Sequence, residues 1–265
     1  MRSFIVAGVV TVATVLGPTG VAAAAPKDYC ADLKGGSTGT TCVIQLADAG
    51  YSVDISFPVG YPDMQPVADF IAQTRDGFLT SAKSGTPRDA PYSLTITPTT
   101  YNSAIPPRGT QAVVLKVTQN VGAGSQTTFK SFNWDQSYRK AIIWTAAPDD
   151  KANTPLWRVD DPLTTVAPIV QAELQKQLAP PPPVAPPPAP GETVPATPTS
   201  TTPAPPPPAP LPFATAALYN PANYQSFAVV NDGIVFFFDQ GVVLPASYGP
   251  LQVLAPRTQI DPMIA

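Results

Sequence analysis

The side chains that could carry out chemistry in this sequence are few, and most of them are aspartates. The 265 residues include no histidine, so the chain lacks the usual general base for a serine or cysteine nucleophile and the commonest metal ligand. An enzyme would have to use a Ser-Lys dyad or a pair of carboxylates, as in glycoside hydrolysis. The candidate carboxylates are Asp135, Asp149, Asp150, Asp160, Asp161, Asp232 and Asp239.

These aspartates and the one glycine-rich segment have a simpler interpretation. Several of the aspartates lie at or near a Pro, Asn or Gly, where aspartate usually forms turns. The glycine-rich residues 35–39 are not followed by the lysine and helix that a phosphate-binding loop requires. We therefore predict no catalytic residue, no cofactor and no metal ion. A carbohydrate-active enzyme that uses an aspartate pair is the alternative.

The two cysteines, Cys30 and Cys42, lie close together in the sequence. A pair of this kind in an exported protein predicts one disulfide. Closing a loop of this size contributes about 3 kcal/mol in the chain-entropy model.

The N-terminal residues predict export. Arg2 is followed by an apolar run at residues 4–16 and by small residues at 22–25. This order is typical of a secretory signal peptide, which we place at residues 1–24. The apolar run is shorter than the roughly 20 residues of a membrane span, and no later segment is long and apolar enough. We expect a secreted, extracellular protein, and association with the cell wall is the alternative.

The charge balance argues against two classes of partner. The chain has 15 basic and 18 acidic residues, a net charge of −3, and no basic run. A mildly acidic surface of this kind does not favour nucleic acid or anionic lipid. We expect the partner to be a protein, a glycan or a host surface, and the protein itself to be a monomer.

Hydrophobic periodicity predicts an α+β fold. Alternating apolar residues indicate strands at residues 43–57 (two strands around a turn), 92–99, 113–117, 127–134, 141–144, 224–230, 234–238 and 251–254. Helical spacing predicts a long helix at 63–84, capped by Asp63, and a shorter one near 165–178 whose regular part starts at Pro168. Three consecutive phenylalanines, 236–238, must point to both faces of their strand, so we expect both faces to be covered.

A proline-rich tract interrupts the second half of the chain. Residues 180–212 hold 17 of the 36 prolines. The residues after the tract are too few for a stable domain without a disulfide, so we expect them to add strands to the earlier sheet. The prediction is one discontinuous domain, residues 25–179 plus 213–265, with the tract as a polyproline insertion. Candidate O-glycosylation sites in the tract are Thr193, Thr197, Thr199, Thr201 and Thr202.

Several motifs resemble those of a known family. They are residues 25–30 (APKDYC), 70–76 (FIAQTRD), 101–116 (YNSAIPPRGTQAVVLK), 134–140 (WDQSYRK) and 223–238 (NYQSFAVVNDGIVFFF). This set is similar to the secreted immunogenic proteins of mycobacteria and covers nearly all of the chain after the signal peptide and outside the tract. Residues 223–257 also resemble the wider RsiV-type extracytoplasmic domain. The tract is longer than the corresponding connection in the family.

The resemblance implies a single β-grasp-like domain, with an antiparallel or mixed sheet packed by one main helix and a second, shorter helix. It also implies export from an actinobacterium and recognition by host immunity, and it supplies no catalytic residue. We therefore predict a secreted, non-enzymatic binding or interaction protein, an immunogenic antigen whose ligand is unknown. The alternatives are a cell-wall-associated module that uses the proline-rich tract as a spacer, and the aspartate-dependent carbohydrate enzyme.

Overall fold

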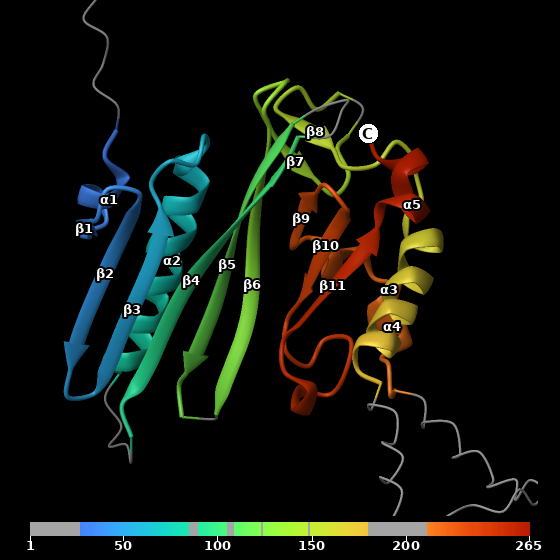
Figure 1. Ribbon diagram of the computed structural model, residues 1–265. Coiled ribbons are helices and arrows are strands. Elements are labelled where there is room, and N and C mark those ends of the chain that lie inside the picture. Colours follow the sequence, from blue (N-terminus) through green and yellow to red (C-terminus); the bar gives the residue numbers. More distant parts are fainter. Residues whose placement is uncertain (1–26, 85–89, 105–108, 123, 148, 180–210) are drawn as a thin grey trace, which may run out of the picture.

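The computed structural model describes residues 27–84, 90–104, 109–122, 124–147, 149–179 and 211–265 (Figure 1). The predicted signal peptide, the candidate glycosylation sites and nearly all of the proline-rich tract lie outside these residues. Within the described part of the chain, no helix has both the length and the apolar character needed to cross a membrane.

A mixed sheet and a few helices confirm the α+β class. The larger sheet has eight strands in chain order: β1 (Gly36–Ser37), β2 (Thr41–Asp48), β3 (Tyr51–Pro58), β4 (Tyr92–Ser103), β5 (Thr110–Asn120), β6 (Ser125–Asp135), β7 (Lys140–Ile143) and β8 (Asn153–Pro155). The smaller sheet contains β9 (Phe227–Val230), β10 (Gly233–Phe238) and β11 (Leu251–Pro256). The helical elements are α1 (Tyr29–Asp32), α2 (Met64–Lys83), α3 (Leu163–Gln177), α4 (Thr215–Leu218), η1 (Pro221–Tyr224), η2 (Ala246–Tyr248), α5 (Arg257–Ile260) and η3 (Asp261–Met263).

Helix α2 makes the crossover that the parallel β3–β4 pair requires. Val67, Ile71 and Phe78 are buried on one side of this helix, in a core shared with the inner residues of β2 to β5. The predicted position and apolar face of the helix are confirmed. Asp63 precedes the helix as predicted, but its side chain makes no capping hydrogen bond.

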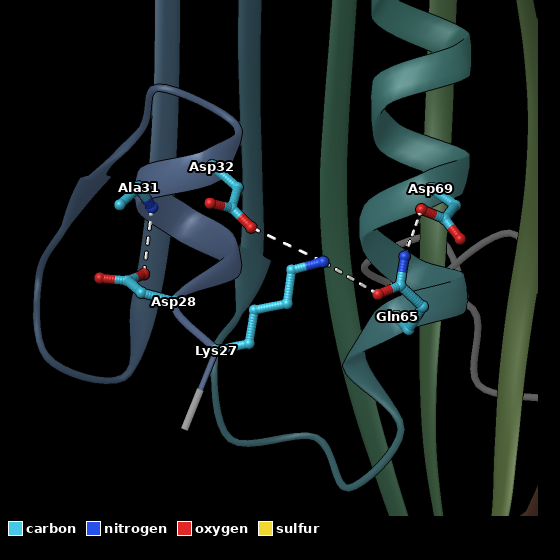
Figure 2. A network of polar contacts seen from close by, with 6 residues as sticks. All are labelled: Lys27, Asp28, Ala31, Asp32, Gln65 and Asp69. Atoms are coloured by element: carbon cyan, nitrogen blue, oxygen red, sulfur yellow. Dashed lines mark hydrogen bonds and ion pairs between the residues drawn. The ribbon is translucent and has the colours of Figure 1, made fainter. Parts of the chain in front are cut away.

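The N-terminal segment is fastened beside β2. A disulfide joins Cys30 of α1 to Cys42 of β2, with a Cα–Cα distance of 5.6 Å. Lys27 Nζ donates to Gln65 Oε1 of α2 at 3.1 Å and lies 3.7 Å from the Asp32 carboxylate (Figure 2). These polar contacts are exposed and contribute little free energy. The disulfide and the burial of Leu33 in the α2 core attach α1 to the rest of the fold.

The residues after the tract form a separate sheet in the order β11–β10–β9, which corrects the prediction that they extend the larger one. Phe237 of β10 lies in one apolar cluster with Ala112 and Val114 of β5, and its ring centroid is 5.4 Å from that of Phe129. The two sheets therefore pack face to face. This arrangement buries an apolar side chain that an added edge strand would leave exposed on one face.

The opposite face of β10 belongs to a second core. Phe236 and Phe238 are buried there with Leu174 of α3. Both faces of the strand are covered, as predicted. Leu178, before the tract, and Phe213, after it, also pack on this core. In Figure 1, the end of α3 and the start of α4 lie at the same end of the smaller sheet. The tract is therefore inserted between two segments that share a core.

The prediction that the second helix becomes regular at Pro168 is wrong, because α3 begins at Leu163 and runs through the proline. Leu163 and Val166 are buried in the second core and hold the first turn in place. Pro168 is exposed. Burial of the first turn outweighs the hydrogen bond that the proline removes.

Candidate functional site

Side chains from the residues after the tract complete the outer edge of β6. β6 pairs with β7 only at Trp134 and Asp135, so among the described residues its earlier part has no strand on that side. Asp239 Oδ1 accepts a hydrogen bond of 2.7 Å from the N–H of Phe129. Ser226 Oγ donates to the carbonyl oxygen of the same Phe129 at 2.9 Å. Polar groups thus join the two sheets alongside the apolar cluster.

The same edge of β6 carries further polar contacts. The N–H of Gln240 donates to the carbonyl of Thr127 at 3.0 Å, and its side chain accepts from the Thr127 N–H at 3.2 Å. Ser131 Oγ accepts from the N–H of Phe227 at 3.0 Å, and Asn133 Nδ2 donates to the Phe227 carbonyl at 2.8 Å. Sequence reasoning missed this role, although the polar residues alternate along β6 and gave a signal for it.

A cleft of about 220 Å³ opens where β6 meets the segments before β9 and after β10, and we call it the junction cleft. Phe129, Ser226 and Asp239 line it. Burial raises the pKa of the Asp239 carboxyl, and the hydrogen bond from Phe129 opposes that shift. Two side chains hydrogen-bond to the backbone of Phe129. Asp239 was named as a candidate from the sequence, and Ser226 was not.

The junction cleft does not bring a lysine to Ser226. Lys130 is the lysine that lines this cleft, but its Nζ lies 5.7 Å from the ring centroid of Phe132. Phe132 packs against the α2 core, on the other face of β6. The ammonium group is therefore turned away, and the described lining holds no second amine for a Ser-Lys dyad.

A larger cleft, of about 430 Å³, lies at the start of α3, and we call it the helix cleft. Asp160 and Asp161 line it with exposed carboxylates, and Asp161 Oδ2 accepts a hydrogen bond of 2.6 Å from Thr164 Oγ1. The Tyr219 side chain, 48% exposed, and the edge of the buried Trp144, 3% exposed, also line it. The structure thus gathers two predicted carboxylates and two aromatic rings from segments far apart in the sequence.

The Trp144 ring packs against other aromatic rings of the core. Its ring centroid lies 5.3 Å from that of Trp157 and 5.2 Å from that of Tyr224. The Tyr224 hydroxyl donates to the Leu218 carbonyl at 2.7 Å, and burial raises the pKa of this phenol, so it stays protonated. The aromatic side of the helix cleft is therefore fixed by packing before any ligand arrives.

Two other predicted aspartates form turns, as their neighbours in the sequence indicate. Asp135 Oδ1 accepts from the N–H groups of Ser137 and Tyr138 at 2.8 and 2.9 Å, between β6 and β7. Asp150 accepts from the side chain and N–H of Asn153, and this bonding holds the pKa of the Asp150 carboxyl below its usual value.

The last two candidates are not brought into either cleft. Asp232 lies in the turn between β9 and β10, and Asp149 is exposed beside a loop. Over the described ranges, no group of three or more His, Cys, Asp or Glu side chains is arranged to hold a metal ion.

Comparison with known proteins gives close relatives over almost the whole chain. The immunogenic proteins MPB64 of Mycobacterium bovis and MPT64 of Mycobacterium tuberculosis are each 48% identical over 258 residues, which covers 97% of this chain and 96% of the relative. A protein named as an esterase from Mycobacterium tuberculosis is 32% identical over 262 residues, covering 98% of both chains.

A family model and a solved structure also match. Residues 155–258 match the family DUF3298, described as a protein of unknown function. A crystal structure of a DUF3298 family protein from Pseudomonas aeruginosa is 10% identical, with a TM-score of 0.48, and the match covers 85% of this chain and 94% of that one. The relatives that match along nearly the full length, on both sides of the tract, decide the assignment: this chain belongs to the family of the mycobacterial immunogenic proteins MPB64 and MPT64.

Proposed function

We propose that this protein is a secreted, non-enzymatic binding protein of the immunogenic antigen type, and that its ligand occupies the helix cleft. The observation that carries the proposal is the combination of Tyr219, Trp144 and two aspartates in a cleft of about 430 Å³. Sites of this kind are concave and offer a few convergent polar groups beside aromatic surface. The relatives that are named as immunogenic proteins support the antigen part of the proposal.

A glycan is the ligand class that suits this lining. A sugar ring has an apolar C–H face, which can lie on an aromatic side chain, and hydroxyl groups, which donate to carboxylates. Asp160 and Asp161 supply acceptors, while Thr145 and Thr164 supply hydroxyls that both donate and accept. A cleft lined in this way holds a neutral polar ligand without needing a catalytic group.

The test measures glycan binding by residues 25–265. An array of neutral oligosaccharides is screened first, and affinities for the best ligands are then measured by calorimetry. Tyr219→Ala and Asp160→Asn should each weaken binding about tenfold or more, which corresponds to about 1.4 kcal/mol. Tyr248→Ala is the matched control, because Tyr248 is 39% exposed and does not line the helix cleft.

The outcomes separate the parts of the proposal. Glycan binding that Tyr219→Ala and Tyr248→Ala reduce equally would move the ligand away from the helix cleft. Cleavage of a bound glycan, lost in Asp160→Asn, would contradict the non-enzymatic part and favour the carbohydrate enzyme. Absence of any glycan ligand would reject the ligand class.

Ester hydrolysis is a second candidate, favoured by the relative named as an esterase. The junction cleft holds candidate groups for it, Ser226 Oγ as the nucleophile and the Asp239 carboxylate as the proton acceptor. Each of them hydrogen-bonds to the backbone of Phe129, so the Ser226 hydroxyl must leave the Phe129 carbonyl and turn to Asp239 before it can attack an ester. Hydrolysis of short p-nitrophenyl esters should then be lost in Ser226→Ala. Activity at the level of a heat-denatured sample, or activity that Ser226→Ala retains, would exclude this mechanism.

We also propose that residues 41–120 form a β-grasp-like arrangement. Hairpin β2–β3, helix α2 and hairpin β4–β5 follow one another in the chain, and the helix covers one face of their sheet. This hairpin–helix–hairpin order supports the proposal.

A further inference from the structure

The two edges of the larger sheet differ in how they are covered. The outer edge of β6 is covered by polar side chains from the residues after the tract. At the other end of the sheet, β1 is the only described strand beyond β2, and it pairs only with Cys42 and Val43. Residues 44–48 of β2 therefore form an edge with no strand beside it in the described part of the chain.

The hydrogen-bonding groups on this open edge can be assigned. The N–H of Thr38 donates to the carbonyl of Thr41 at 2.8 Å, and Val43 is the next odd-numbered residue paired with β1. Because backbone groups alternate sides along a strand, odd-numbered residues of β2 direct their N–H and C=O toward the outer edge. Gln45 and Ala47 continue this series past the end of β1.

The open edge has few of the features that usually prevent strand pairing, and its one charged side chain, Asp48, stands at its end. Residues 41–47 contain no charged side chain and no proline, although charges and prolines are common on edge strands that must not pair. Leu46 lies between the two outward-directed residues and is 37% exposed. It continues the row of Cys42 and Ile44, which are buried in the α2 core.

We propose that a second copy of this chain docks on this edge, with the two β2 strands antiparallel about a two-fold axis at Leu46. In this register Gln45 faces Ala47 of the other copy, so the outward N–H and C=O groups of both residues pair on each side of the axis. Leu46 faces its own copy in a non-hydrogen-bonded pair, where side chains approach most closely.

The geometry of the edge selects this register. The open stretch is bounded by β1 at residues 42–43 and by the turn after Asp48. An axis at Leu46 pairs Ile44 with Asp48 of the other copy and so uses the whole stretch. A shift of the axis toward residue 44 would place the β1 strand of one copy against β2 of the other, and a shift toward Asp48 would leave part of the stretch unpaired. The interface is isologous and closed, and it leads to a dimer rather than a fibre.

The interaction is expected to be weak, which departs from the monomer that the sequence predicts. Five paired residues on each side bury less than the roughly 1,000 Å² of a stable interface. We expect dissociation in the range of roughly 0.1 to 1 mM. The dimer would form where the exported protein is concentrated, and it would double any ligand site on the chain.

Cysteine cross-linking tests the register directly. Both native cysteines are in the disulfide, so Leu46→Cys in residues 25–265 carries a single thiol. Directly opposed side chains in an antiparallel pair lie within about 5 Å, close enough for a disulfide after small adjustment. Mild oxidation at roughly 100 μM should convert most of the variant to a covalent dimer. Peptide mapping should show that the bond joins the introduced thiols of the two copies.

Leu254→Cys is the matched control, because Leu254 is also 37% exposed but lies on β11 of the other sheet. It should give at least fivefold less dimer in the same time. Equal yields from the two variants would overturn the proposal, because they would report random collisions. A mapped link that joins the introduced thiol to Cys30 or Cys42 would also overturn it.

Sedimentation equilibrium tests the interaction without a cross-link. The unmodified chain should dimerise as its concentration rises to about 1 mM, and Leu46→Lys should weaken this at least tenfold because two ammonium groups would meet at the axis. Ala47→Pro should do the same by removing an outward N–H that the fold does not use. Leu254→Lys should have no effect. A strictly monomeric unmodified chain at 1 mM, or equal effects of both lysines, would reject the dimer.

Discussion

The Asp239 carboxylate lies 2.7 Å from the backbone nitrogen of Phe129, and through this hydrogen bond the loop after β10 is attached to the edge of β6. The two residues are 110 positions apart in the chain. Their contact spans the joint between the two sheets, next to the apolar cluster around Phe237. The stability of this joint should therefore depend on both a titratable group and a packed ring.

Asp239→Asn should make the protein more stable at neutral pH. Burial raises the pKa of Asp239, so the folded protein binds a proton more tightly than the unfolded chain, whose aspartates titrate near 3.9. Stability from this group is present below that unfolded value and is lost as pH rises through the raised folded value. Asparagine stays neutral, and its oxygen can still accept from the Phe129 N–H.

The measurement is the melting temperature of both proteins between pH 3.5 and 8. The advantage of Asp239→Asn should grow as pH rises through the raised pKa and then stay constant. A difference between the two proteins that does not change with pH would show that ionisation of Asp239 has no part in the joint.

Phe237→Ala should loosen the contact between the sheets. The side chain is 3% exposed and lies against Phe129 and Tyr101, with ring centroids 5.4 and 5.8 Å away. Removing a buried phenylalanine leaves a cavity and costs about 3–5 kcal/mol. Urea unfolding measures the loss, and Val235→Ala, a smaller and partly exposed residue on the same face of β10, should cost clearly less. Equal losses would show that the cluster is not centred on Phe237.

Gly35→Ala should disturb the disulfide, whereas Gly36→Ala should not. A Cβ atom at Gly35 would overlap with Cys42 Sγ and lie 3.1 Å from Cys30 Sγ, and a Cβ at Gly36 would meet nothing within 4 Å. Overpacking of this kind costs about 1–3 kcal/mol. Thermal unfolding under oxidising conditions should show the difference between the two variants. Under reducing conditions the difference should shrink, and persistence of the full difference would mean that the strain is not at the disulfide.

Replacement of residues 181–209 by a ten-residue Gly-Ser linker should leave the fold intact. Leu178 and Phe213 pack on the same core, on the two sides of the tract. The entropic cost of loop closure depends only weakly on the number of residues in the connection, so the change is expected to be less than about 1 kcal/mol. The melting temperature should therefore stay constant or rise slightly. A second, lower-melting transition in the shortened protein would contradict the single discontinuous domain.

The local elements were predictable because they depend on neighbours in the chain. Alternation gave β2, β3 and the β4–β5 hairpin, and helical spacing gave α2, since each pattern reports which face is buried. The three phenylalanines of β10 predicted cover on both faces, and the structure provides it. The bonding of Asp135 and Asp150 in turns also followed from local chemistry.

The start of α3 and the placement of the second sheet were not predictable in the same way. Pro168 argued locally for a later start, but burial of Leu163 and Val166 decided the helix boundary. The apolar faces of the phenylalanine strand β10 had to be buried. That requirement does not show whether the strand joins the larger sheet or forms a second sheet packed against it. The polar side chains that join β6 to the second sheet come from residues with no periodic pattern of their own.

From the sequence alone follow the predicted export signal, the longer strands of the larger sheet and helix α2, the cysteine pair and the small set of groups available for chemistry. Which of those groups come together depends on the packing of distant segments. This packing brings Asp239 to Phe129 and Ser226, and Asp160 to Trp144 and Tyr219, while leaving Asp135 and Asp150 in turns. The physical reason is that turns and periodic faces are set by near neighbours, whereas a cleft forms where separate cores and sheets pack together.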